Sequence, residues 1–422
     1  MKPIEAMQEL IVSLDRSDAT LAVVLLMPER GVISEATVST SPEALAAWWE
    51  ALVQTHPGRR LIVAFEQPAP NLVAFFAARQ PAAIYALNPA ATWAFRQSLT
   101  VSGARTDASD ASAQAWFVCH HRHTLKPWMP VSAAVDQLDR FCQAKRKLVD
   151  QRTALTNRLQ AVLKRYYPQA LAMMHEDIWR PMNLAFLRRW PAPAKLKQSR
   201  LGTLRRFFHQ HGSRSEARWA QRAALITALV PLTDADPTAE VLETAVIVDQ
   251  IAALNAGIER YDQVIAEAFA GQGEAAERVS RLPGAGPVLA PRVFVALARY
   301  ADRCVNGEAL AAAVGVAPVT EISGRMRKVY RRFRCDRFTR QTFVEWCKEA
   351  YKHSVWSKAF MDQRQAKGHG FHASLRALAY KWIRILWKCW HDGVAYDESH
   401  YLEQLRRRGS PLVPPTFTTS AN

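Results

Sequence analysis

The feature that most restricts the fold is an alternation of short, apolar, β-rich runs with amphipathic helical stretches in the first quarter of the chain. The β-rich runs lie at 11–14, 21–26, 32–38, 61–65 and 83–87, and the helical stretches lie at 41–53 and 71–78. The first three runs are joined by turn residues, which is typical of consecutive strands in a meander. We therefore predict three strands followed by helix, strand, helix and strand, an α/β arrangement around a mixed sheet.

Four acidic residues occupy informative places in this order of elements, which is that of a ribonuclease-H-like fold. Asp15 follows the first strand, Glu66 ends the fourth, and Asp107 and Asp110 lie three residues apart at the start of a helix. In such a sheet the first and fourth strands are neighbours, so the four carboxylates are expected to converge at one edge. Crowded like charges need a cation, and hard carboxylate oxygens select magnesium or manganese. Two such ions would stabilise the attacking and leaving oxygens of phosphodiester chemistry.

The spacing alone leaves a structural alternative open for the second pair of acids. Asp107 and Asp110 also fit an exposed helix start that Thr106 and Ser109 cap. Downstream, a group of histidines follows the same helix, at positions 120, 121 and 123. We interpret these histidines as surface or packing residues rather than ligands.

Residues 129–272 have the periodicity of long paired helices. One row, Phe141, Leu148, Leu155 and Val162, recurs every seven residues, and Leu138, Leu159 and Tyr166 form a second row that Lys145 and Arg152 interrupt. A cleaner pattern in steps of four and three comprises Ile247, Ile251, Leu254, Ile258, Tyr261, Ile265 and Ala268. We predict two coiled-coil helices that pair with each other or with another copy of the chain, and the sequence does not choose between these partners.

The segment between the two heptad regions is rich in aromatic and basic residues. It contains Trp179, Arg180, Phe186, Arg188, Arg189, Trp190, Lys195, Lys197, Arg205, Arg206, Phe207 and Phe208. One interpretation is a helical insertion whose aromatic side chains are core and whose charges are solvated. The other is an RNA surface, because aromatic rings interleaved with cations suit unpaired bases and phosphates.

A glycine-rich turn opens the mainly helical, basic region that follows. Residues 282–287 resemble the hairpin of a helix-hairpin-helix unit, in which Gly284 and Gly286 would present backbone N–H groups to a phosphate. Turns of this composition also join helices that bind nothing. We expect the surrounding region to be helical as far as about residue 393.

Ser323 and Gly324 precede a strongly basic stretch in which eight of the sixteen residues from 325 to 340 are lysine or arginine. The cations expected to contact nucleic acid are Arg325, Arg327, Lys328, Arg331, Arg332 and Arg334. A hydroxyl among so many cations could attack a phosphodiester, since the cations would stabilise the charged transition state. The alternative is a serine turn beside a phosphate-binding strip.

The charge balance of the whole chain favours a polyanionic partner. Lysine and arginine number 55 against 38 acidic residues, which gives a net charge of +17. No uninterrupted apolar run reaches the roughly 18 residues of a membrane helix, and the N-terminal residues lack the basic, apolar, small-residue order typical of a signal peptide. The six cysteines form no Cys-x-x-Cys pair. We therefore expect a cytosolic protein with reduced thiols, no membrane association and a nucleic-acid partner.

In their order along the chain, these features resemble the DEDD transposases. These are the bridge-RNA-guided recombinases of the insertion-sequence one-hundred-and-ten family, including its eleven-eleven branch. The matching features are Asp15, Glu66, Asn88 with Pro89, Arg105 with Thr106, Asp107, Asp110, the 282–287 hairpin, Ala317 with Pro318, and Ser323 with Gly324. The resemblance runs from about residue 10 to residue 400 and is weakest between 168 and 239. Members often have Gly-Ile where this chain has Ser13 and Leu14, and Ala-Thr-Gly where it has 67–69, but these neighbours are not ligands.

The resemblance implies a domain organisation and a reaction. It implies a RuvC-like domain at 1–128 that uses the DEDD acids, a coiled coil with its insertion at 129–272, and a transposase domain at 273–400. Residues 401–422, rich in proline near the end, are predicted to be a disordered tail. Asp15, Glu66, Asp107 and Asp110 would bind Mg²⁺ or Mn²⁺, and Ser323 would attack DNA to form a phosphoserine. A noncoding bridge RNA would pair with donor and target DNA, and the chain would form a homodimer that becomes a tetramer in synapsis.

Two other classes of function remain open at this stage. In the first, the protein is a metal-dependent nuclease or Holliday-junction resolvase, and Ser323 only contacts phosphate. In the second, it is a nucleic-acid-binding protein without enzymatic activity. The presence of all four acids disfavours the second, and covalent attachment to DNA distinguishes the recombinase from the nuclease.

Overall fold

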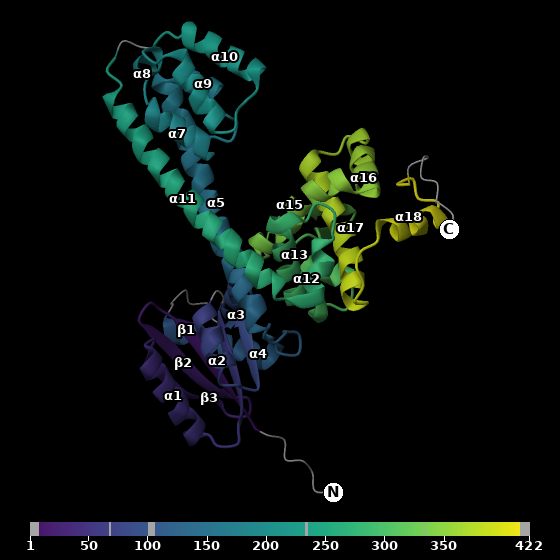
Figure 1. Cartoon of the computed structure of the whole chain (residues 1–422). Helices are drawn as coiled ribbons and strands as arrows, with labels where there is room; N and C mark the ends of the chain where they lie inside the picture. Colours follow the sequence, from purple (N-terminus) through teal and green to yellow (C-terminus); the bar gives the residue numbers. More distant parts are fainter. Residues whose placement is uncertain (1–7, 67–68, 100–105, 233–234, 334, 414–422) are drawn as a thin grey trace. The chain divides into compact units, whose positions relative to one another are not determined.

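The computed structural model describes residues 8–66, 69–99, 106–232, 235–333 and 335–413. It consists of two compact units, Met1–Pro130 and Val131–Asn422. The first unit contains a sheet with helices on both faces, and the second is almost entirely helical (Figure 1). Arg334, predicted to contact nucleic acid, and Arg105 lie outside the described residues.

The first unit is built on one mixed five-stranded sheet. Its strands are β1 Glu9–Arg16, β2 Thr20–Met27, β3 Gly31–Ser39, β4 Arg60–Glu66 and β5 Ala83–Leu87, and its helices are α1 Pro42–Thr55, α2 Pro70–Ala77, α3 Pro89–Leu99 and α4 Asp107–His121. The strand order is β3-β2-β1-β4-β5. The first three strands are antiparallel, whereas β4 runs parallel to both β1 and β5. The predicted mixed α/β fold is thus confirmed, with β1 beside β4 as expected.

Strand β1 is buried on both faces, which explains why its sequence is an apolar run rather than an alternating one. Leu10, Val12 and Leu14 join the core under α1 and α2, where Trp49 and Phe76 pack edge to face. Ile11 points to the opposite core, which α4 covers. Both helical layers therefore anchor the strand that carries Asp15.

The second unit begins with two long helices and a cluster of short ones. They are α5 Ala133–Tyr166, α6 Pro168–Met173, α7 Pro181–Arg189, α8 Pro193–Lys197, α9 Leu201–Gln210, α10 Glu216–Thr227 and α11 Thr238–Ala270. Helices α5 and α11 pack along each other within the chain (Figure 1). The structure therefore pairs the two heptad regions with each other, which the sequence had left undecided.

Two cations that interrupt the heptad pattern of α5 have partners on α11. Lys145 forms an ion pair with Asp262. Arg152 donates from Nη1 to Asn255 Oδ1 at 3.0 Å, and its guanidinium lies 3.9 Å from the centre of the Trp179 ring. Because both cations have partners, the interruptions are compatible with pairing of the two helices.

Among the described helices, α11 is the one whose length and apolar composition would suffice to cross a membrane, with a mean hydropathy of 1.4 over its most apolar window. Its acidic side chains instead bind neighbouring helices of this chain. Glu243 accepts hydrogen bonds from Arg158, and Asp249 accepts from Arg188. These contacts favour a scaffold helix over a spanning one.

The aromatic residues of the insertion form a core and not a surface. Phe186, Trp190, Phe207 and Phe208 are at most 4% exposed and pack on one another. The hypothesis of an RNA surface built on these stacking rings is therefore wrong, since no buried ring is available to a base. The basic residues of the segment, such as Arg189, remain exposed around this core.

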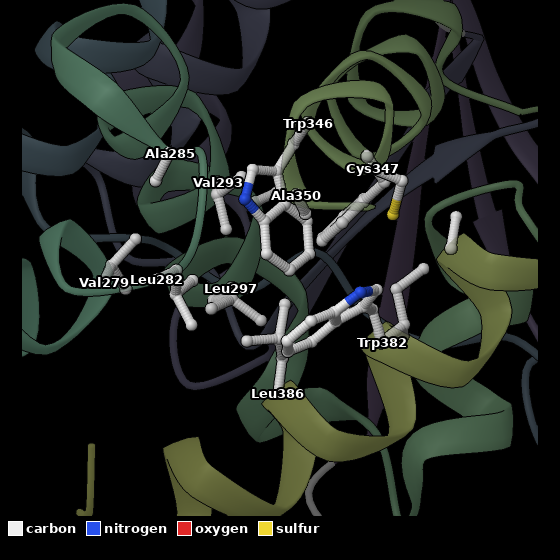
Figure 2. Close-up of a cluster of buried hydrophobic side chains, with 14 of the residues drawn as sticks. Val279, Leu282, Ala285, Val293, Leu297, Trp346, Cys347, Ala350, Trp382 and Leu386 are labelled. Carbon is white, nitrogen blue, oxygen red and sulfur yellow. The ribbon is translucent and has the colours of Figure 1, made fainter. Parts of the chain in front are cut away.

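The remaining helices surround a core rich in tryptophan. The elements are α12 Gly273–Ser280, α13 Gly286–Tyr300, the 3-10 turn Ala301–Arg303, α14 Gly307–Ala313, β6 Val319–Ser323, β7 Met326–Tyr330, α15 Arg337–His353, α16 Val355–Ala366, α17 Phe371–His391 and α18 Glu398–Arg407. Figure 2 shows Trp346 of α15 and Trp382 of α17 facing Leu297 of α13. Their ring centres lie 5.0 Å apart in an edge-to-face arrangement.

Three expectations about this region need correction. The hairpin β6–β7 interrupts the stretch predicted to be helical. Residues 401–407, assigned to a disordered tail, continue α18, because Leu402, Leu405 and Leu412 are buried in the same core; residues 414–422 lie outside the described part. The boundary drawn between 272 and 273 does not separate two compact units, because Val135 and Ile265 of the long helices share that core as well.

Candidate active site

The ends of two neighbouring parallel strands bring the first two acids together. Leu14 pairs with Phe65 in the register of β1 and β4, so Asp15 and Glu66 follow at the same edge of the sheet. Asp15 is half-buried, and its Oδ1 accepts a hydrogen bond at 3.1 Å from Nε2 of Gln114 on α4. Glu66 accepts a hydrogen bond from the hydroxyl of Thr92 on α3.

Helix α4 supplies the other two acids from its first turn. Thr106 caps the helix: its hydroxyl accepts from Ser109 N, and Ser109 Oγ accepts from Thr106 N, at 3.1 and 3.0 Å. The capping contacts of the structural alternative are therefore present. Asp107 is exposed, whereas Asp110 is largely buried and accepts from Nη1 of Arg96 at 2.8 Å. Capping does not exclude a role for the acids, since the cap uses the hydroxyls and leaves both carboxylates at the helix start.

The other three acids act on Asp15 through their charges. Burial raises the pKa of Asp15 above its usual value, and the charge of Asp110 raises that pKa further. The hydrogen bond from Gln114 opposes these effects, while the charges of Glu66 and Asp107 add to the rise. The charges of Glu66, Asp107 and Asp110 thus all act on Asp15 at this edge of the sheet.

The donor chemistry fits a hard divalent cation. Carboxylate oxygens are such ligands, and a cation would relieve the repulsion that raises the pKa of Asp15. Two buried polar atoms beside this acid, Ser13 Oγ and Gln114 Oε1, have no hydrogen-bond partner. Within the described ranges no three acidic, histidine or cysteine side chains stand at metal-binding spacing. Glu66 and Asp110 already have protein partners, Thr92 and Arg96.

A pocket of about 390 Å³ opens beside two of the acids. It is lined by Glu66, Pro89, Ala90, Thr92, Trp93, Arg96, Asp110 and Ala113. Sequence reasoning named Pro89, the first residue of α3, but missed the other residues of that helix in this set. The available signal was the spacing of Ala90, Trp93 and Arg96, which places an aromatic and a cation on one face of a helix.

The histidines at the end of α4 pack against aromatic rings. His120 stacks on Trp116 with ring centres 5.4 Å apart, and His121 lies 5.1 Å from Phe117. Their interpretation as surface or packing residues agrees with these contacts. They lie at the opposite end of α4 from the acids, because helix residues thirteen positions apart are about 20 Å apart along the axis.

In the second unit, Ser323 ends β6 at the tip of a two-stranded hairpin. It pairs with Met326, so Gly324 and Arg325 form a two-residue turn. Gly324 has a φ of +57°, which suits the first turn position of a type II′ hairpin. Ser323 and the cations Arg325, Arg327 and Lys328 are all exposed. The serine is thus presented on an open, basic ribbon.

The two glycines of the predicted phosphate-binding turn lie in different surroundings. Gly284 has a φ of +66° and sits against α15, where an added Cβ would lie 2.7 Å from the carbonyl carbon of Glu349. Gly286 has a φ of +54° and no atom within 4 Å of such a Cβ. Trp346 Nε1 also donates to the carbonyl of Pro283 at 3.0 Å. The turn is therefore packed on α15 through Gly284, and only Gly286 faces solvent.

Comparison with known proteins places the chain in a family. Residues 12–168, which contain the four acids, match the DEDD transposase model of the IS110 type, and residues 276–362, which contain Ser323, match the model described as transposase of the IS116/IS110/IS902 family. The IS117 mini-circle protein of Streptomyces coelicolor, assigned as a transposase, is 26% identical over 327 residues, which cover 75% of this chain and 77% of that protein. The protein y4uE of Sinorhizobium fredii, also assigned as a transposase, is 27% identical over 167 residues, or 40% of this chain and 46% of that protein. The chain therefore belongs to the IS110 family of insertion-sequence transposases, enzymes that cut and join DNA.

Proposed function

We propose that this transposase recombines DNA through a covalent phosphoserine at Ser323, assisted by the carboxylates Asp15, Glu66, Asp107 and Asp110, and that a noncoding bridge RNA selects donor and target. The observation that carries the proposal is the placement of Ser323. Ser323 is exposed at a tight turn and has cations nearby in the sequence. Both faces of the hairpin that carries it are exposed to solvent, so a substrate can reach the hydroxyl.

The chemistry assigned to Ser323 is a transesterification. Its Oγ forms a bond to the phosphorus of the scissile phosphodiester, its proton passes to a base, and the bond from phosphorus to the adjoining sugar oxygen breaks. That sugar leaves as a hydroxyl, which takes up a proton. Attack by a hydroxyl of the exchanging strand reverses the step and frees Ser323, so joining needs no ATP because the ester retains the bond energy.

The surrounding cations have a separate task. Charge accumulates on the phosphoryl oxygens during attack. Arg325 in the turn and Lys328 on the same face of the ribbon as Ser323 would offset it, and Arg327 on the opposite face would add to the general attraction for phosphate. Arg331 and Arg332 follow β7 and extend the basic strip toward the phosphates on either side. Gly286, at the exposed start of α13, adds a backbone N–H that can bind a further phosphate.

The carboxylates would hold Mg²⁺ or Mn²⁺, and a bound divalent ion would supply stabilisation of phosphoryl charge. Within the protein, Gln114 orients Asp15, Thr92 orients Glu66, and Arg96 holds Asp110. These three partners keep the acids at the sheet edge before an ion binds.

The basic surface supports partners that are polyanions. The net charge of +17 and the exposed cations of the insertion suit a protein that holds RNA together with donor and target DNA. We also propose a cytosolic homodimer that pairs into a tetramer during synapsis. Sequencing the RNA that copurifies with the protein tests the guided mechanism: an RNA encoded by the same element is expected, and RNA-free protein that recombines DNA would contradict it.

Recombination by hairpin variants tests the role of the serine. Ser323→Ala should bind DNA but form no recombinant product. Thr320→Ala is the matched control, because Thr320 is an exposed hydroxyl of the same strand on the opposite face of the ribbon. It should recombine at close to the normal rate. Normal recombination by Ser323→Ala would return the serine to a phosphate-contact role and favour a metal-dependent nuclease.

A further inference from the structure

Helix α3 presents an unusually exposed indole beside the carboxylates. The chain has 13 tryptophans, all of them within the described residues. Trp93 is 58% exposed, whereas the other twelve are buried or partly buried. Its neighbour Thr92 is buried and holds Glu66, so α3 is firmly attached to the site at this turn. An exposed indole offers a large, flat apolar face to a planar ligand.

The pocket around Trp93 has the size and lining of a small binding site. Ala90, Trp93 and Arg96 form one wall from α3, Asp110 and Ala113 form another from α4, and Glu66 closes the end at β4. The small side chains of the two alanines leave about 390 Å³, which lies within the usual range for ligand pockets. None of the aromatic pairs within the described ranges includes Trp93, so the flat face of its indole is not occupied by another ring.

The chemistry of this lining selects the kind of ligand. An open indole face beside apolar walls favours a flat aromatic group, and the adjacent carboxylates belong to the proposed phosphodiester site. Bases inside a duplex have both faces covered by their neighbours, so only an unpaired base can stack on a protein ring. Arg96, on the same face of α3, places a cation next to the acids, where the sugar-phosphate of such a nucleotide would lie.

We propose that this pocket is a stacking subsite for an unpaired nucleobase of the DNA strand that is cut, with the indole of Trp93 as its platform. The subsite rests on the proposed function, because the nucleotide that it binds would belong to the DNA strand held at the neighbouring carboxylates. It would hold the scissile phosphate in register with the acids. Loss of the ring should therefore weaken binding of a target that contains an unpaired nucleotide and leave fully paired DNA unaffected.

Fluorescence of 2-aminopurine placed at an unpaired position of a DNA target tests the subsite on the full chain, with calcium as the divalent ion. The wild type should quench the probe by stacking. Trp93→Ala should abolish the quenching and weaken binding by roughly 5- to 150-fold, the range expected for loss of one stacked base. Trp93→Phe, which keeps a ring, should restore most of the quenching. Leu99→Ala is the control, since Leu99 is an exposed apolar residue of the same helix outside the pocket lining, and it should match the wild type.

Several results would overturn the proposal. Quenching by Trp93→Ala equal to that of the wild type, or equal loss in Leu99→Ala, would remove Trp93 as the platform. A Trp93-dependent signal with an RNA probe but not with DNA would overturn the assignment to the cut strand. DNA cutting that depends on Asp15 but shows no effect of Trp93 would refute the subsite alone, whereas Trp93-dependent stacking in a protein that never cuts DNA would support the subsite and refute the proposed function.

Discussion

Replacing Gly284 by alanine should destabilise the second unit far more than the same change at Gly286. Both glycines have positive φ, which costs an alanine about 1–2 kcal/mol. At Gly284 the new Cβ would also lie 2.7 Å from the carbonyl carbon of Glu349 and 2.8 Å from the nitrogen of Ala350. These are backbone atoms of α15, and overpacking of this kind costs a further ~1–3 kcal/mol. The expected loss is therefore about 2–5 kcal/mol for Gly284→Ala and about 1–2 kcal/mol for Gly286→Ala.

Chemical denaturation, followed by the fluorescence of the buried tryptophans near the turn, measures this difference. Trp346 and Trp382 lie in the core that includes Leu282 and Ala285 (Figure 2), so their signal reports loss of this packing. Nucleic-acid affinity measured on the folded variants separates packing from ligand contact. If Gly284→Ala unfolds like the wild type yet loses affinity for DNA, the close approach to α15 is not the reason for this glycine, and the reasoning is refuted.

Two further changes follow from the burial and charge of particular residues. Asp15→Asn should abolish DNA cutting and should also raise the melting temperature of the metal-free protein at neutral pH, because the raised pKa of Asp15 means that its ionisation destabilises the fold. That gain should shrink as the pH falls through the raised pKa toward the usual value of 3.8, and a variant that is less stable at neutral pH would contradict it. Ile251→Glu should cost about 4 kcal/mol or more by burying an unpaired charge between α11 and its neighbours, whereas Ala253→Glu, at an exposed position, should change stability by less than about 0.5 kcal/mol. Circular dichroism melts of the two variants check the contrast, and equal melts would show that this face of α11 is not a core.

The elements that sequence reasoning found are those whose burial leaves a periodic pattern. Strands β1 and β4 are apolar runs because both faces of the sheet are covered, and their adjacency in the predicted order was enough to bring Asp15 and Glu66 together. The sequence could not tell whether the two heptad regions pair within one chain or between two copies, because an apolar helix face packs equally well in either arrangement. The contacts of Lys145 and Arg152 across the seam identify that partner only once the structure is known.

The elements that sequence reasoning missed either have no buried face or have a buried face that the spacing of apolar residues does not reveal. Hairpin β6–β7 is exposed on both sides, so its sequence lacks the alternation of apolar and polar residues that marks a half-buried strand. The available signal was Gly324, which follows the β-branched residues Val319, Thr320 and Ile322. In the insertion, the same aromatic spacing suits a core or a stacking surface, and the rings of Phe186 and Trp190 turned out to be core. Trp93 was missed because the pocket that it lines includes residues of another helix, Asp110 and Ala113 of α4, which the sequence does not place beside α3.

The most direct test of the central claim is the identification of the residue that becomes attached to DNA. A target that carries a nick or mismatch beside the cut site stalls the reaction, and denaturing electrophoresis followed by peptide mapping then locates the adduct. The account predicts a phosphodiester link to the peptide that contains Ser323, formed by the wild type and by Thr320→Ala and lost in Ser323→Ala. Cut DNA that is free of protein, or an adduct on any other residue, would contradict it.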